Sequence, residues 1–332
     1  MSQLPERVDV MNSKYAPIVL FVYKREKHVQ QVLDALDANI LADQSSLFIF
    51  SDGYKDDTEK IEVEKVRDCI RQYKKNNHFQ QVTIYEMDKH CGLANSVITG
   101  VTRIMNDYGR VIVLEDDLVT SKDFLMYMND ALDYYASEKS VWSIAGYSPN
   151  MKELSRYHKD VYVCMRASST GWATWKDRWD SIDWDVKDYP QFVKDIKKRE
   201  EFRKRGYNMP EMLDARMQGK VDSWAIIFCY EQFKQNKVTI NPTVSKIKNI
   251  GYDGSGTHKE NAKHWDVVLR QNVQKTDFIM PEIDKKIVRA YFFFHAGNSL
   301  QRFMKMIKYK LHVAFFYIRC KGIFSNYDKA SE

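Results

Sequence analysis

The chain is poor in cysteine and has none at the spacing of a metal or redox site. Its five cysteines are an odd number spread over 332 residues, and no Cys-x-x-Cys occurs. This argues against a disulfide framework and a structural zinc site, and it favours reduced thiols in a cytosolic compartment. Repeats and low-complexity segments are also missing. With 44% hydrophobic and 29% charged residues, the composition is that of a globular protein and excludes disorder and collagen.

Long apolar runs are absent as well. The longest, such as residues 17–22 and 313–318, are far shorter than the roughly 20 residues of a membrane-spanning helix. The first residues, MSQLPERVDVMNSK, contain no apolar core of a secretory signal. We therefore expect a protein that is made and kept in the cytoplasm.

Two phosphate-binding motifs are missing, the Walker A sequence and a G-x-G-x-x-G that follows a strand. Their absence disfavours P-loop NTPases and dinucleotide enzymes. Residues 251–256 (GYDGSG) are rich in glycine but lie in no strand–helix pattern. Backbone N–H groups of this loop, with Lys246, Lys248 and His258 nearby, could approach phosphate oxygens. A surface loop without a ligand explains the segment equally well.

The charge is unevenly distributed along the chain. The formal net charge is +6, but residues 285–332 hold ten basic and two acidic residues, so this tail carries +8 and the rest −2. Within the tail, residues 299–318 have the spacing of an amphipathic helix with a basic flank, which suits an anionic membrane surface. A helix packed on the core is the equal alternative. Nucleic acid is not expected, because no motif or extended basic face for it is present.

Short apolar runs alternate with segments of helical periodicity in the first 150 residues. The pattern predicts strands at 18–22, 47–50, 82–85 and 111–114, and helices at 26–41, 56–74, 92–106 and 122–136. Later helices are expected near 190–205 and 222–235. The alternation predicts an α/β fold with a mostly parallel sheet and helices on both faces. Such sheets bind ligands at the carboxyl ends of their strands.

Polar clusters follow three of these strands: Lys24-Arg25, Ser51-Asp52-Gly53 and Glu115-Asp116-Asp117. Three adjacent carboxylates repel one another, and a cation relieves that repulsion. Hard oxygen ligands suit Mg²⁺ or Mn²⁺, which typically bind one or two carboxylates together with substrate phosphates. A helix start, favoured by acids near its N-terminal dipole, is the alternative.

Other candidate residues have a structural alternative as well. Asp222 opens the predicted helix at 222–235, where an N-cap is the usual role of aspartate. His90 follows the third strand, and a lone histidine more often makes a structural hydrogen bond. Tryptophan is concentrated in residues 171–184, a segment that could stack on sugars.

In order along the chain, these features resemble metal-dependent nucleotide-sugar glycosyltransferases of the GT-A fold, and the N-acetylglucosaminyltransferase I-like group in its bacterial relatives above all. The resemblance covers roughly residues 15–260. It is most specific at Val113–Leu118 (VLEDDL), which resembles the group's form of the DxD motif. The weaker elements are the first strand with Arg25, Asp52-Gly53, residues 90–94 (HCGLA), the Gly-Trp element at 171–175, Asp222-Ser223-Trp224, and residues 242–245 and 251–258. Val221 stands where the group has tryptophan.

The resemblance implies a role for each matching residue. Asp117 would hold Mn²⁺ or Mg²⁺, and Asp222 would be the general base of an inverting displacement. The nucleotide-sugar would be bound by Arg25, Asp52, His90, Glu115, Asp116, Ser255 and His258. Gly171, Trp172 and Trp224 would lie on the acceptor side. The donor would be a UDP-sugar, UDP-GlcNAc being one candidate, from which a hexose or N-acetylhexosamine is transferred.

The same resemblance implies one GT-A domain with a basic tail. We expect residues 15–150 to bind the nucleotide-sugar, residues 151–284 to bind the acceptor and complete the catalytic site, and residues 285–332 to form the helical tail. The acceptor would be a saccharide or a lipid-linked saccharide in bacterial surface-glycan biosynthesis, at the inner face of the cytoplasmic membrane. The alternatives are a metal-dependent phosphohydrolase or nucleotidyltransferase, and a non-enzymatic peripheral membrane protein that binds carbohydrate.

Overall fold

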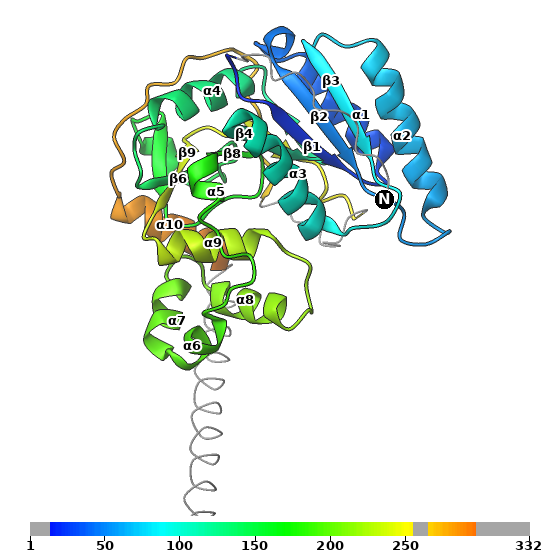
Figure 1. Cartoon of the computed structure of the whole chain (residues 1–332). Coiled ribbons are helices and arrows are strands. Elements are labelled where there is room, and N and C mark those ends of the chain that lie inside the picture. The colour runs from blue at the N-terminus through cyan, green and yellow to red at the C-terminus, as the bar shows by residue number, and fades with distance from the viewer. Residues whose placement is uncertain (1–13, 255–264, 297–332) are drawn as a thin grey trace, which may run out of the picture.

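A single eight-stranded sheet dominates the computed structural model, which describes residues 14–254 and 265–296 (Figure 1). The strands lie in the order β3-β2-β1-β4-β8-β6-β9-β7. Their bounds are β1 Ile18–Val22, β2 Ser46–Ser51, β3 Gln81–Glu86, β4 Arg110–Glu115, β6 Val141–Ala145, β7 Val161–Cys164, β8 Trp172–Trp175 and β9 Val238–Pro242. The four strands predicted from the first 150 residues are confirmed within one residue at each end.

Most of the sheet is parallel. β3, β2, β1 and β4 pair in parallel, and β6 and β9 run in the same direction because β8 is antiparallel to both β4 and β6. β7 pairs antiparallel with β9 at the edge. The α/β class and the mostly parallel sheet are confirmed, and the arrangement is consistent with a GT-A-like fold. Strands from before and after residue 150 join in this one sheet.

Helices cover both faces of the sheet, as predicted (Figure 1). Alternate side chains of a strand point to opposite faces. In β1, Ile18, Leu20 and Val22 pack with α1, α2 and α4, whereas Val19 and Phe21 pack with α3. Burial on both faces explains why these strands are continuous apolar runs in the sequence.

The helices follow the predicted periodicity, with shifted ends. Their bounds are α1 Glu26–Asp37, α2 Lys60–Lys75, α3 Leu93–Tyr108, α4 Phe124–Tyr134, α5 Lys176–Trp179, α6 Tyr189–Lys194, α7 Ile196–Arg203, α8 Met209–Met217, α9 Ala225–Lys234 and α10 Lys285–Ala296. Two short 3-10 helices span Ala42–Gln44 and Leu154–Arg156. The helix predicted near 190–205 is two helices, because the chain leaves helical geometry at Asp195, whose side chain caps α7. In Figure 1, α6, α7 and α8 gather below α9.

A two-stranded ribbon lies outside the main sheet. β5 (Leu118–Thr120) directly follows the acidic residues after β4, and β10 (Ile247–Asn249) pairs with it in antiparallel fashion. The register places Asn249 opposite Leu118. The ribbon therefore brings the chain after residue 249 back to the carboxyl end of β4.

The first part of the basic tail packs on the body of the protein. In α10, Ile287 and Tyr291 are buried in a cluster with Tyr162 and Cys164 of β7. The predicted amphipathic helix at 299–318 lies outside the described residues. In the ranges that the structure describes, no helix is long and apolar enough to cross a membrane. The cysteines there, Cys69, Cys91, Cys164 and Cys229, are free thiols.

Candidate functional site

Polar side chains collect at the carboxyl ends of three neighbouring strands. β1 lies between β2 and β4, with Val22 opposite Ser51 and Phe21 opposite Glu115. Arg25 follows β1, and Asp52 follows β2. Adjacent strands are about 4.8 Å apart, so these groups lie within roughly two strand spacings of one another. The topology thus brings the residues that bear chemistry to one edge of the sheet.

Arg25 binds two of the three adjacent acids. Its guanidinium hydrogen-bonds the carboxylate of Asp116 and, at 2.8 Å, Oδ2 of Asp117. Burial lowers the pKa of Arg25, but the two carboxylates outweigh it and raise that pKa above its ordinary value. Burial raises the pKa of Asp116, and Arg25 only partly opposes the effect. The cation that three clustered acids require is thus supplied in part by the chain itself.

Glu115 differs from its two neighbours. Its side chain forms no hydrogen bond or ion pair with any residue that the structure describes. Burial raises its pKa to about 8, with repulsion from Asp117 and Asp116 adding to the shift. The shift favours the protonated form of Glu115, and a neutral carboxyl can donate one hydrogen bond and accept others.

Gly251 closes over the acids from the end of the ribbon. The N–H of Ile250 donates to the backbone oxygen of Asp117 at 2.8 Å. A Cβ on Gly251 would lie 2.2 Å from Oδ2 of Asp117 and 2.8 Å from Nη1 of Arg25. A side chain at this position would displace the ion pair, so glycine is required here for close approach. The sequence marked this glycine only as part of a glycine-rich loop.

A metal at this site would depend on oxygens from its ligand. Among residues 14–254 and 265–296, no three His, Cys, Asp or Glu side chains are grouped to hold a metal ion. Asp117 alone offers one carboxylate, and Arg25 contacts its Oδ2. One carboxylate together with substrate phosphates is a usual set for Mg²⁺. The residues fit a metal that takes most of its ligands from the substrate, and Asp117 would be its protein ligand.

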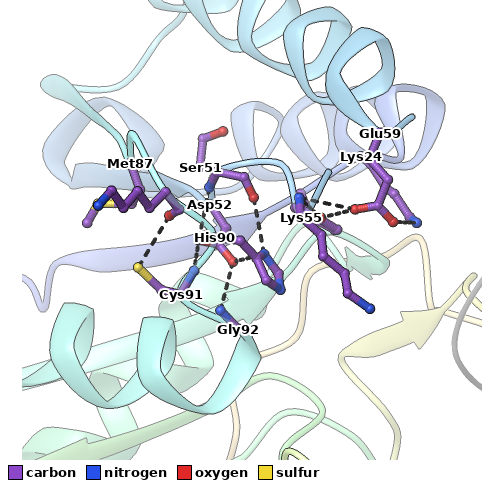
Figure 2. A network of polar contacts seen from close by, with 12 residues as sticks. Lys24, Ser51, Asp52, Lys55, Glu59, Met87, His90, Cys91 and Gly92 are labelled. Carbon is purple, nitrogen blue, oxygen red and sulfur yellow. Dashed lines mark hydrogen bonds and ion pairs between the residues drawn. The ribbon is translucent and has the colours of Figure 1, made fainter. Parts of the chain in front are cut away.

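Asp52 anchors the turn between β3 and α3 (Figure 2). Its carboxylate accepts the backbone N–H groups of Gly53 at 2.9 Å, Cys91 at 2.8 Å and Gly92 at 3.1 Å. His90 Nδ1 lies 2.8 Å from Oδ2 of Asp52 and 3.1 Å from the backbone oxygen of Gly53. Both of these are acceptors, so Nδ1 carries the proton and Nε2 is the acceptor nitrogen in the neutral ring. Asp52 and His90 therefore lie together, as two residues predicted to meet one ligand should.

The glycine after Asp52 has a steric reason. A Cβ on Gly53 would lie 2.4 Å from the backbone carbonyl carbon of Lys89. The turns after β2 and β3 touch through their backbones at this point. Asp52 and Gly53 therefore hold the turn after β2 against the turn after β3.

Two residues that the sequence did not mark extend this network. Glu59 accepts hydrogen bonds from the Tyr23 hydroxyl and the Lys24 ammonium, and the Lys24 contact appears in Figure 2. The Tyr23 ring lies 5.3 Å from the His90 ring, centroid to centroid. Burial, followed by the Glu59 hydrogen bond, raises the pKa of Tyr23. Glu59 has no sequence signal, because it sits among other charged residues before α2.

Asp222 contacts the N-terminus of α3. Its Oδ2 accepts the N–H of Ala94 at 3.1 Å, and its Oδ1 lies 3.3 Å from Nη1 of Arg216. The alternative of an N-cap on its own helix is wrong, because α9 begins at Ala225 without a side-chain cap. A Cβ on Gly92 would lie 2.8 Å from Oδ2 of Asp222. Gly92 is thus in contact with both Asp52 and Asp222, and the side chain of Asp222 is half exposed.

The residues assigned to the acceptor side lie in the core. Trp172 and Trp224 are 1% and 2% exposed, and their rings lie 4.9 Å apart. Gly171 has φ +60°, and a Cβ there would lie 1.8 Å from Cδ1 of Ile247. The assignment of these three to an acceptor site stays a prediction. Because Trp172, Trp175 and Trp179 are all buried, the idea that this segment stacks on sugars is wrong for those three rings.

Ser255 and His258 lie outside the described residues. Two lysines named with them have other partners: Lys246 is paired with Asp123 at 2.5 Å, and Lys248 with Asp266 at 2.9 Å. The predicted phosphate contacts of this loop therefore remain predictions.

No protein-family model and no curated protein matches the chain. Among solved structures, the chain is similar to the crystal structure of TarS from S. aureus, with a TM-score of 0.33 and 13% sequence identity. The similarity covers 48% of this chain and 28% of that one, so the match spans less than a third of the length of that chain.

Proposed function

We propose that this protein is an inverting glycosyltransferase that moves a sugar from a nucleotide-sugar to a saccharide or lipid-linked acceptor. The observation that carries the proposal is the convergence of Arg25, Asp52, His90 and the three acids after β4 at one edge of a parallel sheet. Ligands of open α/β sheets bind at this edge. The resemblance of the acidic segment to a DxD motif supports a nucleotide-sugar, with UDP-GlcNAc as the first donor to test.

Each polar group at this edge has a place in the proposed reaction. Asp52 and His90 would bind the nucleoside end, because Asp52 fixes the turn that carries His90. Arg25 would contact the diphosphate, exchanging part of its contact with Asp116 and Asp117. Glu115 and Asp116 would hydrogen-bond the donor sugar. When bound at Asp117, Mn²⁺ or Mg²⁺ supplies positive charge to the leaving diphosphate.

Asp222 would act as the general base. Its half-exposed carboxylate can meet an acceptor hydroxyl, while Ala94 and Arg216 hold it in one orientation. As the acceptor oxygen bonds to the anomeric carbon, its proton passes to Asp222 and the bond to the nucleotide diphosphate breaks. One displacement from the face opposite the leaving group inverts the anomeric configuration. Such assistance is typically worth about 10²–10⁴-fold in rate.

The two halves of the chain would divide these tasks. We assign donor binding to residues 15–150 and the acceptor side, with the base, to residues 151–284. The basic residues of the tail, 285–332, would hold the enzyme at the anionic inner face of the cytoplasmic membrane. Surface-glycan assembly would supply an acceptor there.

A thermal-shift panel of nucleotide-sugars with and without Mn²⁺ tests the proposal. A bound donor stabilises by RT ln(1 + [L]/Kd), so the correct donor should raise the melting temperature more than its relatives do. Stabilisation should weaken when a chelator replaces the metal. A panel in which no nucleotide-sugar raises the melting temperature would refute donor binding.

The base is tested separately with Asp222→Asn. The amide oxygen can keep the hydrogen bond from Ala94, so the fold and donor binding should persist. Turnover should fall at least about 10²-fold. Near-normal turnover would contradict the assignment of Asp222. Donor consumption that is not accelerated by any acceptor would instead indicate a phosphohydrolase or nucleotidyltransferase.

A further inference from the structure

A concave region lies on the same edge of the sheet, beyond the acidic residues. It is a cavity of about 460 Å³ at the carboxyl ends of β6 and β9 and the start of β7. Because β6 and β9 run in the same direction as β4, this cavity opens on the edge that carries Arg25 and Asp117. It involves none of the residues assigned above to the donor, the metal or the base.

The ribbon connects this cavity to the acidic residues. Lys246 lines the cavity, and Gly251, five residues later, contacts Asp117. An extended chain advances about 3.3 Å per residue, so the two places are at most about 16 Å apart along the ribbon. One extended molecule of a few sugar units can therefore reach from the cavity to the acidic residues.

Four cationic side chains line the cavity, and two of them are already neutralised. Lys159 is paired with Glu282 at 2.7 Å, and Lys246 with the buried Asp123 at 2.5 Å. These lysines therefore contribute no net charge to a ligand.

The other two cations have no close partner of opposite charge. Arg270 and Lys275 form no ion pair in the ranges 14–254 and 265–296, although Asp130 attracts Lys275 at longer range. Arg270 is held by a 2.7 Å hydrogen bond from Nη1 to the side-chain oxygen of Gln274. Asp160, the carboxylate in the lining, accepts the backbone N–H of Asp277 at 3.0 Å. That hydrogen bond leaves the charge of Asp160 in place, so Arg270 and Lys275 outweigh one carboxylate and the lining keeps a net positive charge.

The remaining lining suits a hydroxylated molecule. Hydroxyl and amide side chains alternate with small apolar surfaces, among them Asn150, Thr243 and Thr276 beside Met151 and Val267. Binding sites for small molecules commonly combine a few polar groups with apolar walls in a volume of this order.

We propose that this cavity binds an anionic group, a phosphate or a carboxylate, carried on the saccharide acceptor, and that Arg270 and Lys275 supply its counter-charge. The proposal rests on the transferase function proposed above and names the class of its acceptor. A negative group held here positions the acceptor chain along the ribbon, toward the donor.

Direct binding tests the proposal without any donor. Inorganic phosphate, glucuronate and neutral glucose are titrated separately into the full chain by calorimetry, in metal-free buffer. At least one of the two anions should bind, and glucose should not. Phosphate and glucuronate distinguish a phosphate from a carboxylate as the recognised group. In Arg270→Gln/Lys275→Gln, the anion should bind at least tenfold more weakly, because each residue provides a charge-assisted hydrogen bond.

Lys197→Gln/Lys198→Gln is the matched control. It removes the same net charge from exposed positions on α7 that do not line the cavity, and it should bind the anion as the wild type does. The melting-temperature shift given by the nucleotide-sugar should be unchanged in both double variants, which separates this site from the donor site. The proposal is overturned if neither anion binds, if the Arg270/Lys275 variant binds normally, or if the control loses as much affinity. Absence of a donor shift with intact anion binding would count against the transferase function alone.

Discussion

Replacing Asp52 by asparagine isolates the contribution of one oxygen atom. In the wild type, one carboxylate oxygen accepts the N–H groups of Gly53 and Cys91, and the other accepts the N–H of Gly92 and contacts His90. The side-chain oxygen of asparagine can still accept the N–H groups of Gly53 and Cys91. Its NH₂ group then faces Gly92 N–H, and two donors cannot bond. His90 can keep its proton on Nδ1 and donate to the backbone oxygen of Gly53, which lies 3.1 Å away.

The cost of Asp52→Asn follows from the group left without a partner. Asp52 is 8% exposed and Gly92 is partly buried, so water replaces the lost acceptor for Gly92 only in part. A buried donor without a partner costs about 1–3 kcal/mol, and we expect the free energy of unfolding to fall by that amount. Urea denaturation at neutral pH, followed by tryptophan fluorescence, measures it.

The control is Asp43→Asn, at an exposed aspartate of a 3-10 helix, which should change stability little. Hydrogen exchange adds a local readout, because the Gly92 amide should lose protection in Asp52→Asn whereas the Cys91 amide keeps its acceptor. A change of less than about 0.5 kcal/mol, with normal protection at Gly92, would refute the hydrogen-bond network as described.

Three further substitutions test other contacts by urea denaturation. Gly251→Ala places a methyl group against Asp117 and should lower the free energy of unfolding by about 1–3 kcal/mol; an unchanged value would show that the two do not touch. Gly171 has a positive φ, and a Cβ there would lie 1.8 Å from Ile247. Gly171→Ala should therefore lower the free energy of unfolding by more, about 2–5 kcal/mol. A loss no larger than that of Gly251→Ala would contradict the packing described. For Asp123→Asn the loss should be about 3 kcal/mol at pH 7. Burial alone would raise the pKa of Asp123. Hydrogen bonds, of which the one from Lys246 has the largest effect, outweigh burial and hold that pKa below its usual range. The stability that this pair adds is therefore present above the ordinary aspartate pKa and lost as pH falls through the lowered one, so the two proteins should converge in acid; a constant difference would contradict the shift.

The strands of the first half could be predicted because both of their faces are buried. A run such as Ile18–Val22 can be identified without knowing which strands it pairs with. The predicted ends of these strands lie within one residue of the observed ends. The order of the later strands could not be predicted, since β8 enters between β4 and β6 through pairings remote in sequence. The long irregular segment before α6 and α7 gives no periodic signal that would reveal these pairings.

The site was predictable where its residues follow strands directly. Asp52 and Asp116 lie one residue beyond their strands, so the parallel topology alone places them at one edge. Contacts that depend on a returning chain were not predictable, above all those of Gly251 with Arg25 and Asp117. Asp222 shows a related limit: its neighbours in sequence suggested a cap for its own helix, but its partner is the N-terminus of α3, 128 positions away.

The β5–β10 ribbon fixes the number of residues between Lys246 and Gly251. Asn249 is in register with Leu118, and Gly251 must reach Asp117 two residues later. Inserting or deleting one residue between Lys246 and Gly251 would turn every following side chain to the other face of the ribbon and replace the glycine at the acids by a neighbour with a Cβ. This short stretch should therefore tolerate no change of length, whereas loops elsewhere on the surface can lengthen at little cost.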